Sequence, residues 1–319
     1  MFTETDLPRT PGVRHAGWVG TPSAAGVDEM TRRRGWSPAA AGPAGPPAPE
    51  PTRAAAGPPV APFRPAGGAA VVGVTGARGG AGASTLAAAL AATAARAGRL
   101  AALVDGAHTG AGVDVLLGIE EEPGLRWADL SEARGEVDPD RLLDLLPQWS
   151  GARVLSTDRV RALARPDDVE PDVLRALATA CDLVVLDLPA GRAPLRAAAC
   201  HALVVVARCD TLSVAGAQSL VAGLDGAPSP AVGLVCRGPA VGRLLPHDVA
   251  AASGLELWGE LVADRALEQA VEAGAGPTVR ASPQRGRRRR AASATSLGGV
   301  AATLDAHVRS IADAWRTVP

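Results

Sequence analysis

The chain has 319 residues and a formal net charge of −1; 47% of its residues are hydrophobic and only 3% are aromatic. This charge argues against a protein that coats nucleic acid, and neither a signal-peptide pattern nor an apolar run of about 18 residues predicts secretion or a membrane span. We therefore expect a cytoplasmic protein with an Ala/Val/Leu core, in which the four cysteines, which form no C-x-x-C pair, are buried thiols.

Residues 1–66 differ in composition from the rest of the chain. They include the stretch AAGPAGPPAPEPTRAAAGPPVAPFRPAGG, which is dominated by proline, alanine and glycine. Such a segment cannot bury enough apolar surface to offset the entropy lost on ordering. Residues 1–66 are therefore predicted to be a disordered tail.

From residue 67 onward, apolar runs alternate with helical stretches. Strands are predicted at Ala70–Thr75, Leu100–Val104, Val154–Ser156, Leu183–Leu186, Leu203–Ala207 and Ala231–Cys236, and helices at Ser84–Ala97, Pro171–Ala180, Ala193–Ala199 and Val214–Ala222. Runs that are apolar throughout fit strands buried on both faces of a parallel sheet. The pattern predicts one doubly wound α/β domain over residues 67–280, with a mostly parallel sheet, helices on both faces and a helical insertion over Glu120–Asp144.

A glycine-rich segment, GARGGAGAST, follows the first predicted strand at residues 76–85. In phosphate-binding loops the backbone N–H groups surround phosphates at a helix N-terminus, and a lysine before the Ser/Thr neutralises the terminal phosphates. Here that lysine position is Ala83, and the chain contains no lysine at all. The loop therefore predicts nucleotide binding but places hydrolysis in question.

Two other interpretations of the loop stay open on sequence grounds. Residues 75–82 also fit T-G-x-x-x-G-x-G, the dinucleotide turn of short-chain dehydrogenases, in which Asp105 would bind a ribose. The chemistry of that family uses a Tyr-x-x-x-Lys relay, and this chain has neither tyrosine nor lysine. The third interpretation is a glycine-rich turn that binds no ligand.

Two aspartates end later predicted strands. Asp105 lies in VDGAHTGAGVDVLLG at residues 104–118, and Asp187 lies in CDLVVLDLPAG at residues 181–191. An acid at a strand end is where P-loop proteins hold the Mg²⁺ shell beside the loop hydroxyl, which here is Ser84. The order of loop and aspartates favours the phosphate-loop interpretation.

These segments resemble the ParA/MinD group of deviant Walker A ATPases, and within it the actinobacterial CpaE-like or septum-site-determining proteins. The resemblance covers about residues 68–280 and implies that ATP and Mg²⁺ are the ligands. It assigns the phosphates to Gly79, Gly80, Ala81, Gly82, Ala83, Ser84 and Thr85, and the Mg²⁺ shell to Ser84 and Asp187. It also implies partners in septum or pilus and secretion machinery, a homodimer, and a peripheral location at the membrane or cell pole.

The chain departs from the pattern of that family at several positions. Arg78 stands at the signature lysine that reaches the nucleotide of a partner subunit, and Asp105 keeps only one carboxylate of the switch pair because residue 107 is alanine. Arg78 and Asp105 are the candidate catalytic residues, and Arg237 replaces an asparagine that contacts the purine in many relatives. Loss of one preorganised donor costs on the order of 10²–10³ in rate, so we expect very slow ATP hydrolysis or none. The alternative is a pseudo-ATPase scaffold that acts without nucleotide.

Residues 281–319 form the last predicted segment. The run RGRRRR at residues 285–290 is expected to be a solvated loop, with weak contact to DNA or anionic lipid as the alternative. Further on, apolar residues at 3–4 spacing predict an amphipathic helix: Leu297, Val300, Leu304, Val308, Ile311 and Trp315. Its polar face mixes acidic and basic residues, so we expect the helix to pack on the domain rather than on a membrane.

Overall fold

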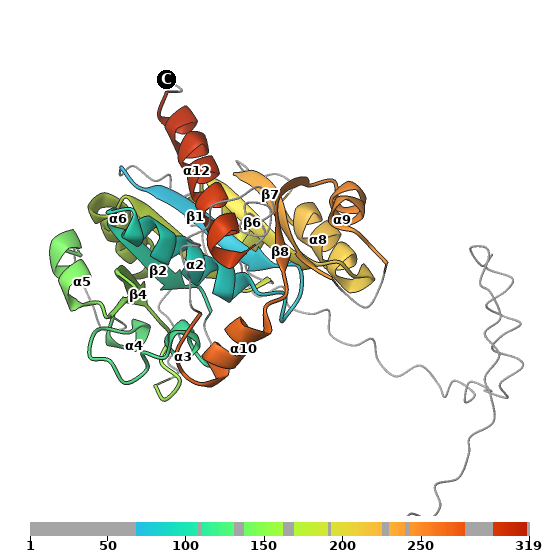
Figure 1. The fold of residues 1–319 in the computed structure, drawn as a ribbon. Coiled ribbons are helices and arrows are strands. Elements are labelled where there is room, and N and C mark those ends of the chain that lie inside the picture. The colour runs from blue at the N-terminus through green and yellow to red at the C-terminus, as the bar shows by residue number, and fades with distance from the viewer. Residues whose placement is uncertain are drawn as a thin grey trace, which may run out of the picture. The chain divides into compact units, whose positions relative to one another are not determined.

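The computed structural model describes residues 68–107, 110–130, 137–161, 169–190, 193–224, 230–239, 243–277 and 296–317. The predictions for the tail at residues 1–66 and for the arginine run at residues 285–290 lie outside these residues. The described part forms an eight-stranded sheet with helices packed on both faces (Figure 1). The predicted α/β class and mostly parallel sheet are confirmed.

The sheet has the strand order β3-β4-β2-β5-β1-β6-β7-β8, and every neighbouring pair is parallel except the antiparallel pair β3–β4. The strands are β1 (Ala70–Gly76), β2 (Ala101–Asp105), β3 (Gln148–Trp149), β4 (Ala152–Leu155), β5 (Leu183–Leu188), β6 (Ala202–Arg208), β7 (Ala231–Gly238) and β8 (Glu256–Val262). All six predicted strands are present. The two edge strands, β3 and β8, were not predicted; β8 exposes Glu256 and Glu260 and so lacks a continuous apolar run.

The position of β5 in the sheet decides between two interpretations of the loop. β5 pairs with β1 on one side and with β2 on the other, and Asp105 lies directly opposite Asp187. In the Rossmann sheet of dehydrogenases, β1 lies beside β2. The short-chain-dehydrogenase alternative is therefore wrong, because an inserted strand carries Asp187 to the loop that follows β1.

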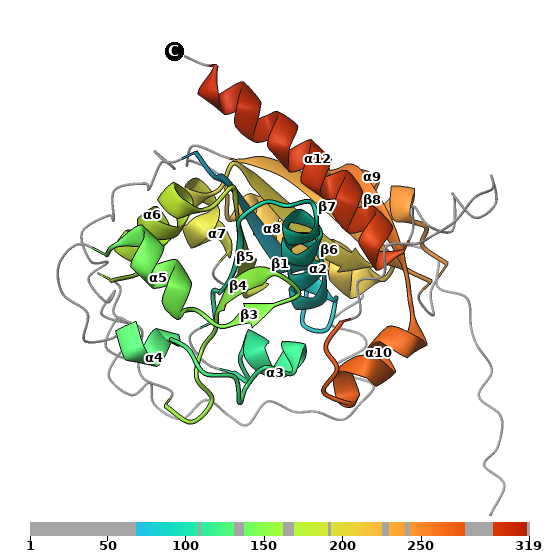
Figure 2. The ribbon, with the colours of Figure 1, turned by 60° about the vertical axis from the view of Figure 1, so that its left-hand side comes forward.

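Two layers of helices cover the sheet. On one face, α2 (Ala83–Arg96) and α12 (Leu297–Arg316) lie over the central strands (Figure 2). The opposite face is covered by α6 (Val169–Ala180), α8 (Thr211–Ala222) and α9 (Pro246–Ser253). The shorter helices are α3 (Val113–Leu117), α4 (Trp127–Leu130), α5 (Pro139–Leu145), α7 (Ala193–Arg196), a 3-10 turn (Ala197–Ala199) and α10 (Arg265–Glu272).

The long C-terminal helix α12 packs along α2 and β8. Small side chains allow the close approach, since Ala89 and Ala92 of α2 meet Ala301 of α12. The buried Asp305 of α12 is paired with Arg99 from the loop after α2, and with Arg309 one turn further along the helix. Of the predicted apolar stripe, Val300, Leu304 and Val308 are buried against the domain, whereas Trp315 near the end of the helix is exposed. Among the described residues, no helix combines the length and apolar character needed to cross a bilayer.

Candidate functional site

The phosphate loop connects the end of β1 to the start of α2. Gly80 (φ 73°) and Gly82 (φ 104°) adopt left-handed backbone conformations, which side chains with a Cβ rarely adopt. Gly82 is the N-cap of α2, and no described side chain caps this helix. The N–H groups of its first turn are therefore oriented for an anionic ligand, as a phosphate-binding loop requires.

Ser84 and Asp187 lie together beside this loop. The Ser84 hydroxyl forms a hydrogen bond with the carboxyl group of Asp187. Loss of solvent around this carboxyl group raises the pKa of Asp187 to about 7; the hydrogen bond to Ser84 opposes the rise and the charge of Asp105 adds to it. Such a pair of hard oxygen ligands suits Mg²⁺, whose charge would favour the ionised form of Asp187.

The carboxylate of Asp105 is held by its own chain. It accepts hydrogen bonds from the backbone N–H groups of Ala107 (2.8 Å), Val113 (3.1 Å) and Thr157 (3.3 Å). The Trp127 indole N–H donates to the Asp105 carbonyl at 2.9 Å. Asp105 therefore fastens the loop after β2 to the end of β4, although it was predicted as a catalytic candidate from its position at the strand end.

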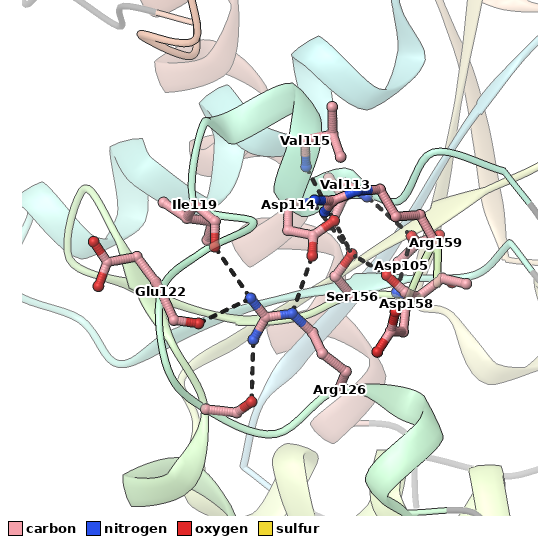
Figure 3. A network of polar contacts seen from close by, with 12 residues as sticks. Asp105, Val113, Asp114, Val115, Ile119, Glu122, Arg126, Ser156, Asp158 and Arg159 are labelled. Atoms are coloured by element: carbon pink, nitrogen blue, oxygen red, sulfur yellow. Dashed lines mark hydrogen bonds and ion pairs between the residues drawn. The ribbon is translucent and has the colours of Figure 1, made fainter. Parts of the chain in front are cut away.

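A buried polar network extends from Asp105, and its central residues Asp114, Arg126 and Ser156 were not predicted as site residues (Figure 3). The Arg126 Nε donates to Asp114 at 3.0 Å, and the Ser156 hydroxyl donates to the other oxygen of the same carboxylate at 3.0 Å. The remaining Arg126 donors bind the carbonyls of Ile119, Glu122 and Gly124. An aspartate between two valines was the available signal in the sequence, since a buried charge requires a partner.

The Arg78 side chain forms an ion pair within its own chain, although the family resemblance predicted that it reaches a partner subunit. Its Nη2 lies 2.8 Å from Oδ2 of Asp210. The other oxygen of that carboxylate, Oδ1, accepts from the Ser213 N–H and so caps α8. The guanidinium of Arg78, together with the hydrogen bonds from Ser213, lowers the pKa of Asp210 to about 2. Arg78 is thus bound to Asp210 in this conformation.

Arg237, at the end of β7, is brought next to the loop. Its Nη1 lies 3.7 Å from the point where a Cβ on Gly82 would lie, and its Nη2 lies 2.6 Å from the Glu268 carboxylate of α10. A cavity of about 520 Å³ opens here. Its walls include Gly82 and Thr85 of the loop, Arg237 and Glu268, and apolar side chains that include Leu116, Leu261, Leu267, Val271 and Leu297.

The structure brings most of the predicted site residues together. Ser84, Asp187 and Arg237 surround the loop, whereas Arg78 contacts Asp210 and Ala83 contributes no charge. Within the described ranges, no group of three or more His, Cys, Asp or Glu side chains could hold a metal ion alone.

Comparison with known sequences finds two similar proteins of unassigned role. Both are uncharacterized proteins of Mycobacterium tuberculosis, one from strain CDC 1551 / Oshkosh and one from strain ATCC 25618 / H37Rv. Each is 36% identical over 178 residues, which is 54% of this chain and 50% of the relative. The chain thus matches about half the length of these relatives. No family model matches the chain.

Comparison with solved structures identifies the fold. The septum site-determining protein MinD from Pyrococcus horikoshii OT3, solved with Mg-ADP, covers 78% of this chain and 100% of its own length, with a TM-score of 0.61 and 18% identity. A ParA family ATPase from Chlorobium tepidum TLS covers 76% of this chain and 98% of its own length, with a TM-score of 0.60 and 16% identity. At such identities the likeness concerns the fold. This chain has the P-loop fold of the ParA and MinD ATPases.

Proposed function

We propose that this chain is a nucleotide-responsive regulator of the ParA/MinD type, which binds ATP with Mg²⁺ and hydrolyses it very slowly or not at all. The Ser84–Asp187 pair beside an uncapped phosphate loop is the observation that carries the proposal. Burial of a carboxyl group costs free energy, and a glycine-rich turn without a ligand gains nothing that would offset the cost of a desolvated carboxyl group beside a hydroxyl at its helix start. The third interpretation of the loop, a turn without ligand, is disfavoured on this ground.

Different residues of the site would contact the phosphates, the metal ion and the base of a bound nucleotide. The N–H groups of the loop over residues 79–85 would contact the phosphates, and Ser84 and Asp187 would hold Mg²⁺ and order its water shell. Bound Mg²⁺ would supply charge neutralisation to the phosphates. The cavity beside Arg237 would receive the base.

The same site lacks the charges that accelerate phosphoryl transfer. Ala83 replaces the lysine of the loop, residue 107 is alanine, and Arg78 is bound to Asp210. Phosphoryl transfer depends on precisely positioned charge. The missing lysine, the missing carboxylate at residue 107 and the ion pairing of Arg78 should therefore lower the rate more than they lower nucleotide affinity. The site therefore favours binding as a switch over turnover.

The cellular role is inferred from the solved relatives, which is an analogy of fold. They include MinD in a MinC:MinD cell division complex from Aquifex aeolicus, at a TM-score of 0.57 and 20% identity. We propose a comparable role in septum placement or in positioning pilus or secretion machinery, with protein partners from that machinery, a homodimeric state, and a cytoplasmic location that becomes peripheral at the membrane or cell pole.

The test of the proposal is an equilibrium titration of ATP, with Mg²⁺ present, into the full chain. Micromolar binding is expected, and Asp187→Asn, which keeps the shape but removes the charge, should weaken it by about tenfold or more. Asp182→Asn is the matched control, because Asp182 directly precedes β5 at the end of the strand away from the loop and the substitution should leave affinity unchanged.

Two results would contradict parts of this proposal. Turnover well above about one per minute that is lost in Asp187→Asn would show an ordinary ATPase and refute the slow-hydrolysis claim. No binding of ATP up to millimolar concentration would refute nucleotide control. The chain would then be a pseudo-ATPase scaffold whose fold acts through protein contacts alone.

A further inference from the structure

Helix α10 is attached to the domain at its two ends and is poorly buried between them. From residue 262 to residue 275, all of which the structure describes, no residue is buried. Figure 2 shows α10 apart from the helices that cover the sheet. A helix of eight residues has little stability of its own and depends on packing of an apolar face. We therefore expect α10 to open more easily than the helices that cover the sheet.

The segments on either side of α10 are held more firmly. Before it, Leu261 near the end of β8 is buried. After it, the backbone of the next turn contacts the end of α3. A Cβ on Gly118 would lie 1.9 Å from the Gly274 carbonyl oxygen, and a Cβ on Gly276 would lie 2.7 Å from that of Leu117. Gly274 (φ 71°) and Gly276 (φ 66°) have left-handed backbone conformations, so this turn can serve as a pivot.

The inner side of α10 faces the cavity beside the phosphate loop. Leu267 and Val271 are partly buried and line this cavity. Gly82 and Thr85 of the loop line it as well. Its volume, about 520 Å³, lies in the range of small-molecule sites. A nucleotide whose phosphates contact the loop would therefore place its nucleoside against the apolar side of α10.

An ion pair connects the middle of α10 to the sheet. Oε1 of Glu268 lies 2.6 Å from Nη2 of Arg237 at the end of β7, and both residues line the cavity. The Glu268 side chain is 59% exposed, so water weakens the attraction and the pair can open and close at little cost. It can thus hold α10 over the cavity without sealing the cavity permanently.

We propose that α10 is a lid that closes over the nucleoside of a bound nucleotide, with the glycine turn after it as its pivot and the Arg237–Glu268 pair as its latch. This inference rests on the proposed function, since it requires that the loop bind phosphates. A ligand shifts a helix toward one position only if it makes additional contacts in that position. Here those contacts are apolar ones between the nucleoside and the inner side of α10, which both lose water when the lid closes.

Hydrogen–deuterium exchange of the full chain tests the lid. Amide exchange is measured for the chain alone, with saturating Mg²⁺ and ATP, and with saturating Mg²⁺ and inorganic triphosphate, which carries the phosphates without a nucleoside. ATP should slow exchange across residues 265–273 by about tenfold or more, and triphosphate should leave it within about twofold of the free chain. Helix α9 has the same length and lies on the opposite face of the sheet, so its exchange should stay unchanged.

Variants assign the effect to α10. Leu267→Ala should weaken ATP binding by about tenfold and leave the affinity for triphosphate unchanged, because only the nucleoside contact is lost. Leu145→Ala removes the same atoms from an exposed position on α5 and should change neither affinity. Glu268→Gln should speed the dissociation of ATP by about threefold, since a neutral amide holds Arg237 less firmly than a carboxylate does.

Three results would overturn the inference alone. They are ATP binding that leaves exchange in α10 unchanged, equal protection of α10 by triphosphate, and an affinity of Leu267→Ala for ATP equal to that of the unaltered chain. Failure of both ATP and triphosphate to bind would overturn the proposed function as well.

Discussion

Asp187 is the residue whose ionisation is opposed most clearly by its surroundings. Its pKa is raised from 3.8 to about 7 by loss of solvent, with a further contribution from the Asp105 charge. At neutral pH, a proton and a divalent cation therefore compete for the same carboxyl group. Binding of Mg²⁺ should release a proton from the site and weaken as pH falls below about 7.

The ligand-free protein should show a matching dependence of stability on pH. Between pH 3.8 and about 7 the folded chain holds a proton on Asp187 that the unfolded chain has released, so the free energy of unfolding falls as pH rises through this window. Asp187→Asn cannot ionise and avoids this loss. We expect its melting temperature to exceed that of the unaltered chain by on the order of 5 °C at pH 8, with the gain vanishing near pH 4.

Thermal denaturation followed by circular dichroism, without Mg²⁺ or nucleotide, measures this difference. Asp182→Asn, at the residue directly before β5, serves as the control, because its amide oxygen can keep the hydrogen bond from the Leu100 N–H. A gain in Asp187→Asn that is equal at pH 4 and pH 8 would show that charge is not its cause.

At the scale of elements, helix α8 packs directly against the backbone of the phosphate loop. A Cβ on Gly216 would lie 1.9 Å from the Ala77 carbonyl oxygen. The helix therefore approaches the loop backbone so closely that only glycine fits at this position. Asp210 at the N-terminus of α8 also holds Arg78 of the same loop. The loop is thus positioned by α8 as well as by β1 and α2.

Gly216→Ala should therefore displace the loop. Because rigid backbone atoms must move, we expect a loss of about 1–3 kcal/mol of stability and weaker nucleotide binding. Denaturant unfolding and the ATP titration measure the two effects. Gly79→Ala is the stability control, since an added Cβ there meets nothing within 4 Å. Equal stability of the Gly216→Ala variant and the unaltered chain would mean that α8 and the loop move apart at little cost.

The elements also show why the sequence predicted some strands and missed others. Central strands such as β1 and β6 are apolar along their length because both faces are covered, and they were predicted within two residues of their bounds. The edge strand β8 has one exposed side and a glycine, Gly259, against Val300 of α12, so its pattern is broken. Edge strands are defined by a neighbour that the local sequence does not show.

Some residues of the candidate site could likewise be predicted from the sequence and others could not. Ser84 and Asp187 were predictable because each ends a recognisable local pattern. The Arg78–Asp210 pair joins residues 132 positions apart, and the Arg237–Glu268 pair joins β7 to a helix that was not predicted. Such pairs depend on the final packing of charged side chains, and no local spacing in the sequence indicates them.

At the scale of the whole molecule, the four thiols are probes of unfolding. Cys181, Cys200, Cys209 and Cys236 are free and buried, and burial raises the pKa of Cys200 to about 12. Thiol reagents attack the thiolate, so the folded chain should react slowly at pH 8 and all four cysteines should react at once in denaturant. An aryl disulfide reagent releases one coloured aryl thiolate for each cysteine that it labels, so absorbance gives the number of reacted cysteines. Fast labelling of one cysteine in the folded protein would show a local opening instead.

The hydrogen bond between the Trp127 indole and the Asp105 carbonyl gives the molecule an optical property. The buried indole is attached to the end of β2, directly across from Asp187 on β5. Indole emission depends on the polarity and hydrogen bonding around the ring, so a shift of that strand end would change the colour and yield of the fluorescence. One of the six tryptophans of the chain is therefore a natural fluorescent reporter that is hydrogen-bonded to the strand end beside Asp187.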